Sequence, residues 1–281
     1  MSVCILILSH ERPQCVSADY IKNNSKYPWY IVLDNSDTMI NEYINKFGAE
    51  HIIIYDKQII LNDADAVVRD KKPTSALYSR IAIELIGTRY DYFVMMDDDL
   101  TDFKFRYVNG ESLGTQHFAE GDFDKVLDAF INYLSVSPKL LWLCFGINST
   151  YVNGVKVFSD EFISTQRLGY QVFIRKATEQ IDWVSIIYQD LIASITYAQR
   201  GYVNLTLPQV TYSAYEMGGK VDGGLSDYYR STSTLYRSMF CYVTHPDCVK
   251  IIERKKKYVP STIKENAFPK IISERYKNER V

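Results

Sequence analysis

The sequence predicts an α/β protein built on an open, mostly parallel sheet flanked by helices, with a smaller mixed region in its second half. Short apolar runs alternate with helical patterns through the first half, which is typical of strand–helix–strand units. Four runs rich in aliphatic and β-branched residues predict strands buried on both faces, at residues 3–8, 30–33, 52–55 and 92–96. The 281 residues contain no low-complexity linker, so we expect one domain.

Two of the intervening segments show clear helical patterns. Residues 75–86 carry Leu or Ile at i, i+4 and i+8, and Gly87 follows as a C-cap. Residues 123–134 form an apolar stripe behind Asp122, which is placed as an N-cap. Helices between strands imply parallel pairing through right-handed crossovers.

The second half has a different composition. Residues 140–145 and 170–174 predict further strands, whereas 146–169 and 205–237 are rich in Tyr, Ser, Gly and Thr and predict loops or lids. The glycines between residues 218 and 226 suit a mobile loop that closes over a ligand, and they suit a flexible surface loop equally well.

Charge is unevenly distributed. The net charge is −2, but residues 250–281 hold ten Lys or Arg against four Glu, which leaves −8 for residues 1–249. This basic C-terminal segment could engage a polyanion such as DNA, or could be a solvated terminal helix. The five cysteines form no Cys-x-x-Cys pair and predict neither disulfides nor a zinc site. No apolar run is long enough for a membrane helix and no leader pattern is present, so we expect no membrane partner and a cytoplasmic location.

Asp97, Asp98 and Asp99 follow the apolar run 92–96 and are the strongest functional signal. Three carboxylates at a strand end repel one another and are costly to desolvate, so a fold that gathers them usually neutralises them with a divalent cation. The sequence therefore predicts a metal site that grips a phosphate.

Polar residues also follow two other predicted strands. Ser9, His10, Glu11 and Arg12 come after the first, and Asp34 begins a polar run after the second. Because ligands bind outside the carboxyl ends of the strands in open α/β sheets, these segments should meet the aspartates at one crevice.

Two of the polar residues have alternative interpretations. Asp34 could accept hydrogen bonds from a base or ribose, or belong only to a turn. Arg80 could reach a phosphate or hold the aspartates, or lie on the surface. No dinucleotide-binding glycine fingerprint and no P-loop is present, so metal and side chains must hold the phosphate.

Together, these residues and the motif Val94-Met-Met-Asp-Asp-Asp-Leu100 resemble a GT-A (Rossmann-like) glycosyltransferase. The resemblance implies that Asp97 and Asp99 bind Mn²⁺ or Mg²⁺ on the diphosphate of a nucleotide-sugar, with a UDP-sugar expected. It implies a nucleotide-sugar-binding half at 1–100 and an acceptor-side half at 101–249. The donor contacts it implies are Ser9, His10, Glu11, Arg12, Asp34, Arg80, Asp97 and Asp98.

Two later residues complete the site that the resemblance implies. Asp190, at the head of a helix-like stretch, corresponds to the second member of an acidic pair that lies near the acceptor hydroxyl, although Gln189 departs from the family pattern. An Asp at a helix start is ordinarily a cap, which is the alternative. His245 is the best-placed histidine for a metal ligand, and a lone His before Pro is more often structural.

The compact core, the Gly-Gly-Leu-Ser loop and the late Lys-rich segment are also similar to the TET-associated glycosyltransferases of bacteriophages. This resemblance implies 5-hydroxymethylcytosine in phage DNA as the acceptor, in host cytoplasm, and gives the basic segment phosphates to contact. Three alternatives stay open: a polysaccharide, lipid or protein acceptor, a metal-dependent phosphotransferase or nuclease, and a nucleotide-sugar or DNA-binding module without turnover.

Overall fold

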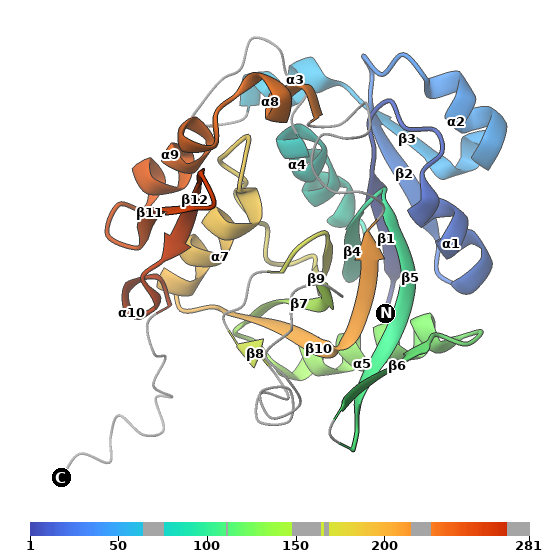
Figure 1. The fold of residues 1–281 in the computed structure, drawn as a ribbon. Coiled ribbons are helices and arrows are strands. Elements are labelled where there is room, and N and C mark those ends of the chain that lie inside the picture. Colours follow the sequence, from blue (N-terminus) through green and yellow to red (C-terminus); the bar gives the residue numbers. More distant parts are fainter. Residues whose placement is uncertain (64–75, 111, 148–163, 166–168, 215–225, 269–281) are drawn as a thin grey trace.

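A large sheet crosses the molecule in the computed structural model, which describes residues 1–63, 76–110, 112–147, 164–165, 169–214 and 226–268 (Figure 1). In order across the sheet, its strands are β3 (Ile52–Tyr55), β2 (Trp29–Asp34), β1 (Val3–Leu8), β4 (Tyr92–Asp97), β9 (Val172–Lys176), β7 (Leu140–Ile147), β10 (Val203–Ala214), β5 (Leu100–Asn109) and β6 (Ser112–His117). A short strand, β8 (Ser164–Thr165), pairs with β10.

The first four strands are parallel to one another, and β7 and β10 form another parallel pair. Between these two groups, β9 runs antiparallel to both β4 and β7. The predicted α/β class with a mostly parallel sheet is confirmed, and the six predicted strands all lie within the observed ones or overlap them. The carboxyl ends of β1, β2 and β4 therefore share one edge, where polar segments follow them.

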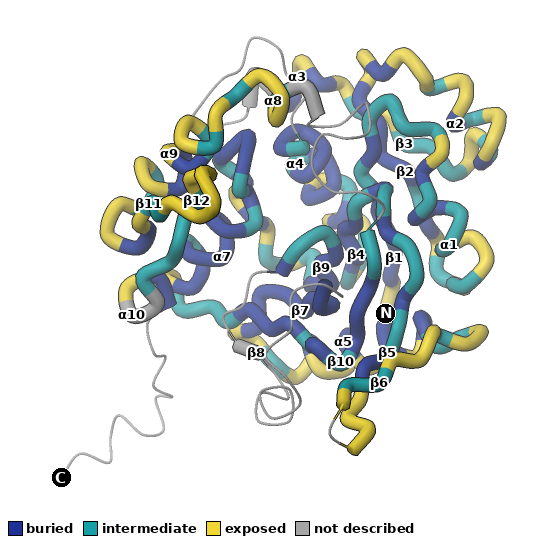
Figure 2. Tube along the Cα trace, in the orientation of Figure 1, coloured by how far each residue is buried: buried dark blue, intermediate teal, exposed yellow. Residues whose placement is uncertain are grey.

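Alternating residues of the central strands fill two apolar layers, one on each face of the sheet. On β1, Ile5 and Ile7 belong to one layer, and Cys4 and Leu6 to the other. The helices α1 (Val16–Asn24), α2 (Ile40–Phe47) and α5 (Asp122–Val136) cover the first layer, and α4 (Ala76–Gly87) and α7 (Gln189–Gln199) cover the second. Figure 2 shows this division between buried strands and exposed outer helix faces.

The two predicted crossover helices are present as α4 and α5, with one correction at a cap. Asp122 is the first residue of α5 and the N-cap is Gly121, in the left-handed region. The carboxylate of Asp122 accepts the backbone N–H of Ala119 at 2.9 Å, so it holds the preceding turn and does not cap the helix.

Two segments differ from the sequence prediction. Residues 205–237, predicted as loops, contain most of β10 together with α8 (Ser226–Ser231) and the start of α9 (Thr234–Thr244). The basic segment begins not as a solvated helix but as a hairpin, β11 (Val249–Arg254) and β12 (Lys257–Thr262), followed by α10 (Lys264–Ala267). Neither strand has a continuous apolar run or a regular alternation of polar and apolar residues, so the sequence signal for both is weak.

The remaining elements are short: η1 (Ala49–His51) and α3 (Lys57–Asp63). The predicted glycine-rich loop up to residue 225 and the end of the basic segment, 269–281, lie outside the described residues. Each of the five cysteines is buried. In the described part of the chain, every helix is too short or too polar to cross a membrane.

Candidate active site

The strand ends bring three sequence-distant segments into contact, as predicted. After β1, Ser9 reaches Asp98 of the β4 end, and His10 reaches Asp34 of the β2 end. The hydroxyl of Ser9 donates to Asp98 Oδ2 at 2.5 Å, and His10 Nδ1 lies 3.0 Å from Asp34 Oδ2. The polar groups that follow β1, β2 and β4 therefore meet at the carboxyl edge of the sheet.

The turn that carries the three aspartates is held by the start of α1. The hydroxyl of Ser17 donates to the carbonyl of Asp97 at 2.7 Å and accepts the N–H of Leu100 at 2.8 Å. The N–H of Ser17 donates to the carbonyl of Asp98 at 3.2 Å. These three bonds satisfy the backbone of a tight turn and fix the direction of each carboxylate.

Asp98 points into the protein and anchors the β1 loop. Its side chain is buried and receives the hydroxyl of Ser9 and, at 3.4 Å, the guanidinium of Arg12. Ser9 is bonded in turn to the hydroxyl of Tyr43 at 2.7 Å. Asp98, predicted as a donor contact, thus has its carboxylate oxygens occupied by Ser9 and Arg12.

Asp97 and Asp99 share a different neighbourhood. Gln171 Nε2 donates to Asp99 Oδ1 at 3.1 Å, and Arg80 Nη2 lies 3.7 Å from Asp97 Oδ1. Burial raises the pKa of Asp97 to about 6, in spite of the opposing charge of Arg80. Burial and the charges of Asp97 and Asp98 raise the pKa of Asp99 to about 8. The site thus concentrates more negative charge than the protein itself neutralises.

Arg80 is the cation at the centre of this group and is not a surface residue. Its side chain is buried, with the guanidinium carbon 4.8 Å from the ring centre of Trp183 and 5.1 Å from that of Phe173. Burial raises the pKa of both Asp97 and Asp190, and the charge of Arg80 opposes this rise in each. Arg80 therefore lies between aromatic rings and carboxylates, and both interactions stabilise its charge.

Asp190 lies in the same site, although it is distant in sequence. It stands in the first turn of α7, whose N-cap is Tyr188 with φ 53° and without a side-chain cap bond. Burial raises the pKa of Asp190, and its charge in turn raises the pKa of Asp97. Asp190 therefore lies near Arg80 and Asp97, while its carboxylate also accepts the backbone N–H of Leu191 in the first turn of α7.

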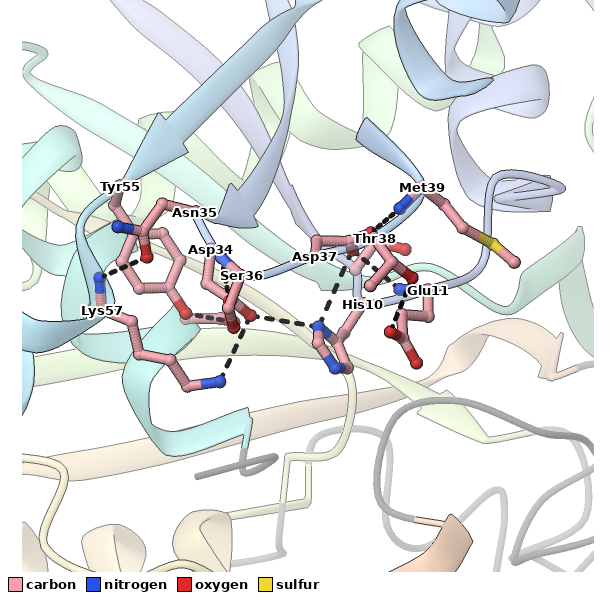
Figure 3. Close-up of polar contacts among 12 residues, drawn as sticks. His10, Glu11, Asp34, Asn35, Ser36, Asp37, Thr38, Met39, Tyr55 and Lys57 are labelled. Carbon is pink, nitrogen blue, oxygen red and sulfur yellow. Dashed lines mark hydrogen bonds and ion pairs between the residues drawn. The ribbon is translucent and has the colours of Figure 1, made fainter. Parts of the chain in front are cut away.

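Asp34 lies at the end of β2, between the side chains of His10 and Lys57 (Figure 3). His10 lies on one side and Lys57 Nζ, 3.5 Å from Asp34 Oδ2, on the other. Ser36 also donates to this carboxylate from its N–H at 2.9 Å and from its hydroxyl. Burial alone would raise the pKa of Asp34, but these hydrogen bonds and the charge of Lys57 lower it, so Asp34 stays ionised.

Lys57 was missed by the sequence analysis, although the same signal was present. It lies two residues beyond β3, in a polar pair that follows the strand just as polar residues follow β1, β2 and β4.

Glu11, predicted as a donor contact, joins two loops: its N–H donates to Asp37 at 2.8 Å, and its carboxylate accepts the hydroxyl of Thr38 at 2.9 Å (Figure 3).

Gln171 is a second residue that the sequence did not reveal. It lies just before β9 with φ 53°, an uncommon conformation for a residue with a side chain, and its carbonyl accepts the N–H of Asp97 at 3.0 Å. No local pattern marks such a position, because the constraint comes from the neighbouring strand β4.

His245, predicted as a metal ligand, contacts α7 through its ring. Its Nε2 is 2.9 Å from the hydroxyl of Thr196, and Ile192 bonds it through the backbone. Thr196 is six residues beyond Asp190 on α7, roughly 9 Å along the helix axis at ~1.5 Å per residue. The ring of His245 is therefore engaged with the middle of α7.

Comparison with known proteins identifies the chain's relatives. The model of the TET-associated glycosyltransferase family matches residues 3–223, and no curated protein matches. The glucosyl-3-phosphoglycerate synthase from Mycobacterium tuberculosis, solved with Mg²⁺ and uridine diphosphate, is similar over 93% of this chain and 86% of that chain, with TM-score 0.50 and 8% identity. GalNAc-T7 with UDP, GalNAc and Mn²⁺ is similar over 87% of this chain and 51% of that chain, with TM-score 0.43 and 12% identity.

The structural likeness to the synthase supports the GT-A fold that the sequence predicted. The family match covers the turn with the three aspartates, Arg80 and Asp190 in one continuous range. The chain therefore belongs to the TET-associated glycosyltransferase family and is a glycosyltransferase.

Proposed function

We propose that the protein transfers a sugar from a UDP-sugar to the hydroxyl group of 5-hydroxymethylcytosine in DNA, with a divalent cation in the site. The observation that carries this proposal is the convergence of Asp97 and Asp190 on the buried Arg80, with Asp99 close to Asp97. Such a group can bind a metal–diphosphate and can accept a proton at one site.

The carboxylates suit a divalent cation. Asp97 Oδ1 is buried and has no hydrogen-bond donor among the described residues. Burial, together with the charges of neighbouring aspartates, also raises the pKa values of Asp97 and Asp99. No three His, Cys, Asp or Glu side chains in the described ranges are placed to hold a metal ion together. We therefore propose only Asp97 and Asp99 as protein ligands of Mn²⁺ or Mg²⁺, with diphosphate and water as the rest.

Residues 1–100 supply the donor side in this proposal. The nucleotide would lie along the loops after β1, β2 and β3, where Lys57 provides positive charge at Asp34 and Arg12 provides it at Asp98. Ser9 and Glu11 hold these loops in place through Asp98 and Asp37. A cation on Asp97 and Asp99 would offset charge on the departing diphosphate.

Residues 101–249 supply the acceptor side through Asp190. In an inverting reaction, the Asp190 carboxylate takes the proton of the acceptor hydroxyl as the oxygen bonds the anomeric carbon and the bond from that carbon to the diphosphate breaks. Arg80 keeps Asp190 and Asp97 at a fixed separation throughout. If configuration is retained, Asp190 would have another role.

Family membership supports the hydroxymethylated base as acceptor, since that is the acceptor implied for this group. We test it by nucleoside mass spectrometry after incubating the protein with Mn²⁺, a panel of UDP-sugars, and duplexes that contain cytosine or 5-hydroxymethylcytosine. We expect a sugar-mass adduct on the hydroxymethylated nucleoside only, and its loss with EDTA. Metal-dependent donor hydrolysis without an adduct would discard the DNA acceptor and keep the glycosyltransferase.

Metal binding should strengthen as pH rises. Without metal, the raised pKa values of Asp97, about 6, and Asp99, about 8, mean that both are protonated at low pH and that stability falls as pH rises through these values. A cation binds the ionised forms, so the gain in Tm on adding Mg²⁺ should increase from pH 5.5 to pH 8.5. Differential scanning fluorimetry measures it, and Asp99→Asn should flatten the upper part of the profile. A gain that is constant with pH would contradict this ligand assignment.

A further inference from the structure

The turn of the β11–β12 hairpin is built from residues that the backbone disfavours. Arg254 pairs with Lys257, so Lys255 and Lys256 form a two-residue turn, and both have positive φ, 48° and 61°. Hairpin turns with positive φ at both positions favour Asn-Gly, because a β-carbon crowds the backbone there. Two lysines in this turn cost stability, which indicates a use other than folding.

The cations of the hairpin are gathered on one side and at its tip. The pairing of the two strands places Lys250, Arg254 and Lys257 on one face of the hairpin. Glu253 lies on the opposite face. These three cations and the turn residues Lys255 and Lys256 make five, and all five are exposed. None of the five forms a salt bridge with a residue in the described part of the chain. Figure 2 shows the exposed hairpin turn. Five positive charges against one negative charge make this an isolated cationic surface.

The hairpin packs against α9, which lies between it and the start of α7. At the far end of α7, Gln199 Nε2 donates to Cys248 Sγ at 3.0 Å, just before β11 begins. Near the turn, the N–H of Tyr258 donates to the hydroxyl of Thr234 at 2.9 Å, at the start of α9. One turn further along α9, Ser238 is hydrogen-bonded to Tyr188, the N-cap of α7.

These contacts fix the hairpin relative to the active site. The α7–α9–hairpin unit shares a buried apolar cluster that includes Leu191 and Val249 (Figure 1). The cationic turn is therefore a rigid part of the same end of the molecule as Asp190. Residues 249–262 also lie beyond the range matched by the family model, which ends at residue 223.

We propose that the hairpin turn, Arg254 to Lys257, docks on the phosphate backbone of duplex DNA and presents the acceptor base to the site; this rests on the proposed function. Lysine and arginine contacts to phosphates position a duplex without reading its sequence. A substituent on C5 of a pyrimidine lies in the major groove, which is wide enough for a two-stranded β-ribbon. A cationic ribbon joined through α9 to the start of α7, where Asp190 lies, has both the charge and the shape for this task.

The test uses a variant that removes charge without harming the turn. In Lys255→Asn/Lys256→Gly, Asn-Gly occupies the positions that favour it, so Tm should not fall. Affinity for a fluorescent duplex, measured by anisotropy at several salt concentrations, should fall on the order of 50-fold at 0.1 M salt, and the slope of log K against log[salt] should become less negative by about 1.8. The matched control, Lys26→Gln/Lys125→Gln, removes two exposed lysines elsewhere and should bind normally.

The same samples separate this proposal from the proposed function. If the double variant binds the duplex as tightly as the wild type, the docking proposal is wrong, whether or not sugar is transferred. If the wild type binds the duplex through these lysines but transfers no sugar to hydroxymethylated DNA, the proposed function fails and the docking surface stands. Absence of duplex binding by the wild type at 50 mM salt, or an equal loss in the control variant, would also overturn the docking proposal.

Discussion

Replacing Asp97 with asparagine is expected to lower the rate of sugar transfer about 10³-fold, equivalent to about 4 kcal/mol of barrier. Asp97 ends β4, faces Arg80 and Asp190, and has a buried oxygen without a hydrogen-bond donor among the described residues. An amide is uncharged and a poor metal ligand, so the variant should lose both cation affinity and turnover. Initial rates of UDP release and calorimetric titration with Mg²⁺ measure the two losses.

The control for this change lies at the opposite end of the same strand. Asp91 precedes β4, is exposed, and bonds the backbone of Ser2 at 2.6 Å. Asp91→Asn makes the same chemical change far from the site and should leave cation affinity intact. A wild-type affinity for Mg²⁺ in Asp97→Asn would remove Asp97 from the ligand set, and more than a tenth of wild-type turnover would contradict its role.

Replacing Arg175 with methionine is expected to cost about 3–5 kcal/mol of stability and to lower Tm by roughly 10 °C. Arg175 is fully buried on β9, and its Nη1 donates to Glu84 Oε1 at 2.6 Å. Glu84 also accepts the indole N–H of Trp183 at 3.0 Å and the N–H of Ile181 at 3.3 Å. Removing the guanidinium leaves a buried carboxylate without its counter-charge, which is the source of the cost.

The pH dependence of this variant has a definite sign. Burial already raises the pKa of Glu84, and the charge of Arg175 opposes that rise, so Arg175→Met should raise it further. A carboxyl group whose folded pKa is raised loses its stability contribution as pH rises through that pKa. Thermal unfolding should therefore show a larger deficit at pH 8 than at pH 5.

Two further variants identify the cause. Glu84→Gln/Arg175→Met keeps an acceptor for Trp183 without the charge, and should recover most of the lost Tm. Arg200→Met breaks an exposed pair with Asp182, 3.4 Å apart, and should cost no more than about 1 kcal/mol. Equal losses in Arg200→Met and Arg175→Met would show that burial of the Arg175 pair is unimportant.

The hydrogen bonds of Glu84 also support the position of Arg80 in the candidate site. Trp183, whose indole Glu84 fixes, provides the ring against which Arg80 lies. Glu84 follows Arg80 by one turn of α4, so one helix presents the active-site cation and the acceptor that positions its aromatic support. Loss of stability at Arg175 and loss of order at Arg80 are therefore expected together.

Local sequence patterns were sufficient for the strands at the centre of the sheet and for the helices α4 and α5. Continuous aliphatic runs and a 3.6-residue apolar repeat depend only on neighbouring residues, so they can be recognised from the sequence alone. The strand β10 was missed because its alternating pattern is shared with polar loops and its partners β5 and β7 lie far along the chain. The hairpin strands β11 and β12 were missed because neither has a continuous apolar run or a regular alternation.

The sequence by itself determined the fold class, and it predicted that polar residues after β1, β2 and β4, with Asp97 and Asp99 among them, would meet at one edge of the sheet. Only the tertiary structure decided that Asp98 turns inward to Ser9 and Arg12 and that Arg80 is buried between carboxylates. It likewise brought Lys57 and Gln171 into the site and engaged His245 with α7. The physical reason is that burial and hydrogen-bond partners depend on contacts between residues tens of positions apart, which local periodicity does not encode.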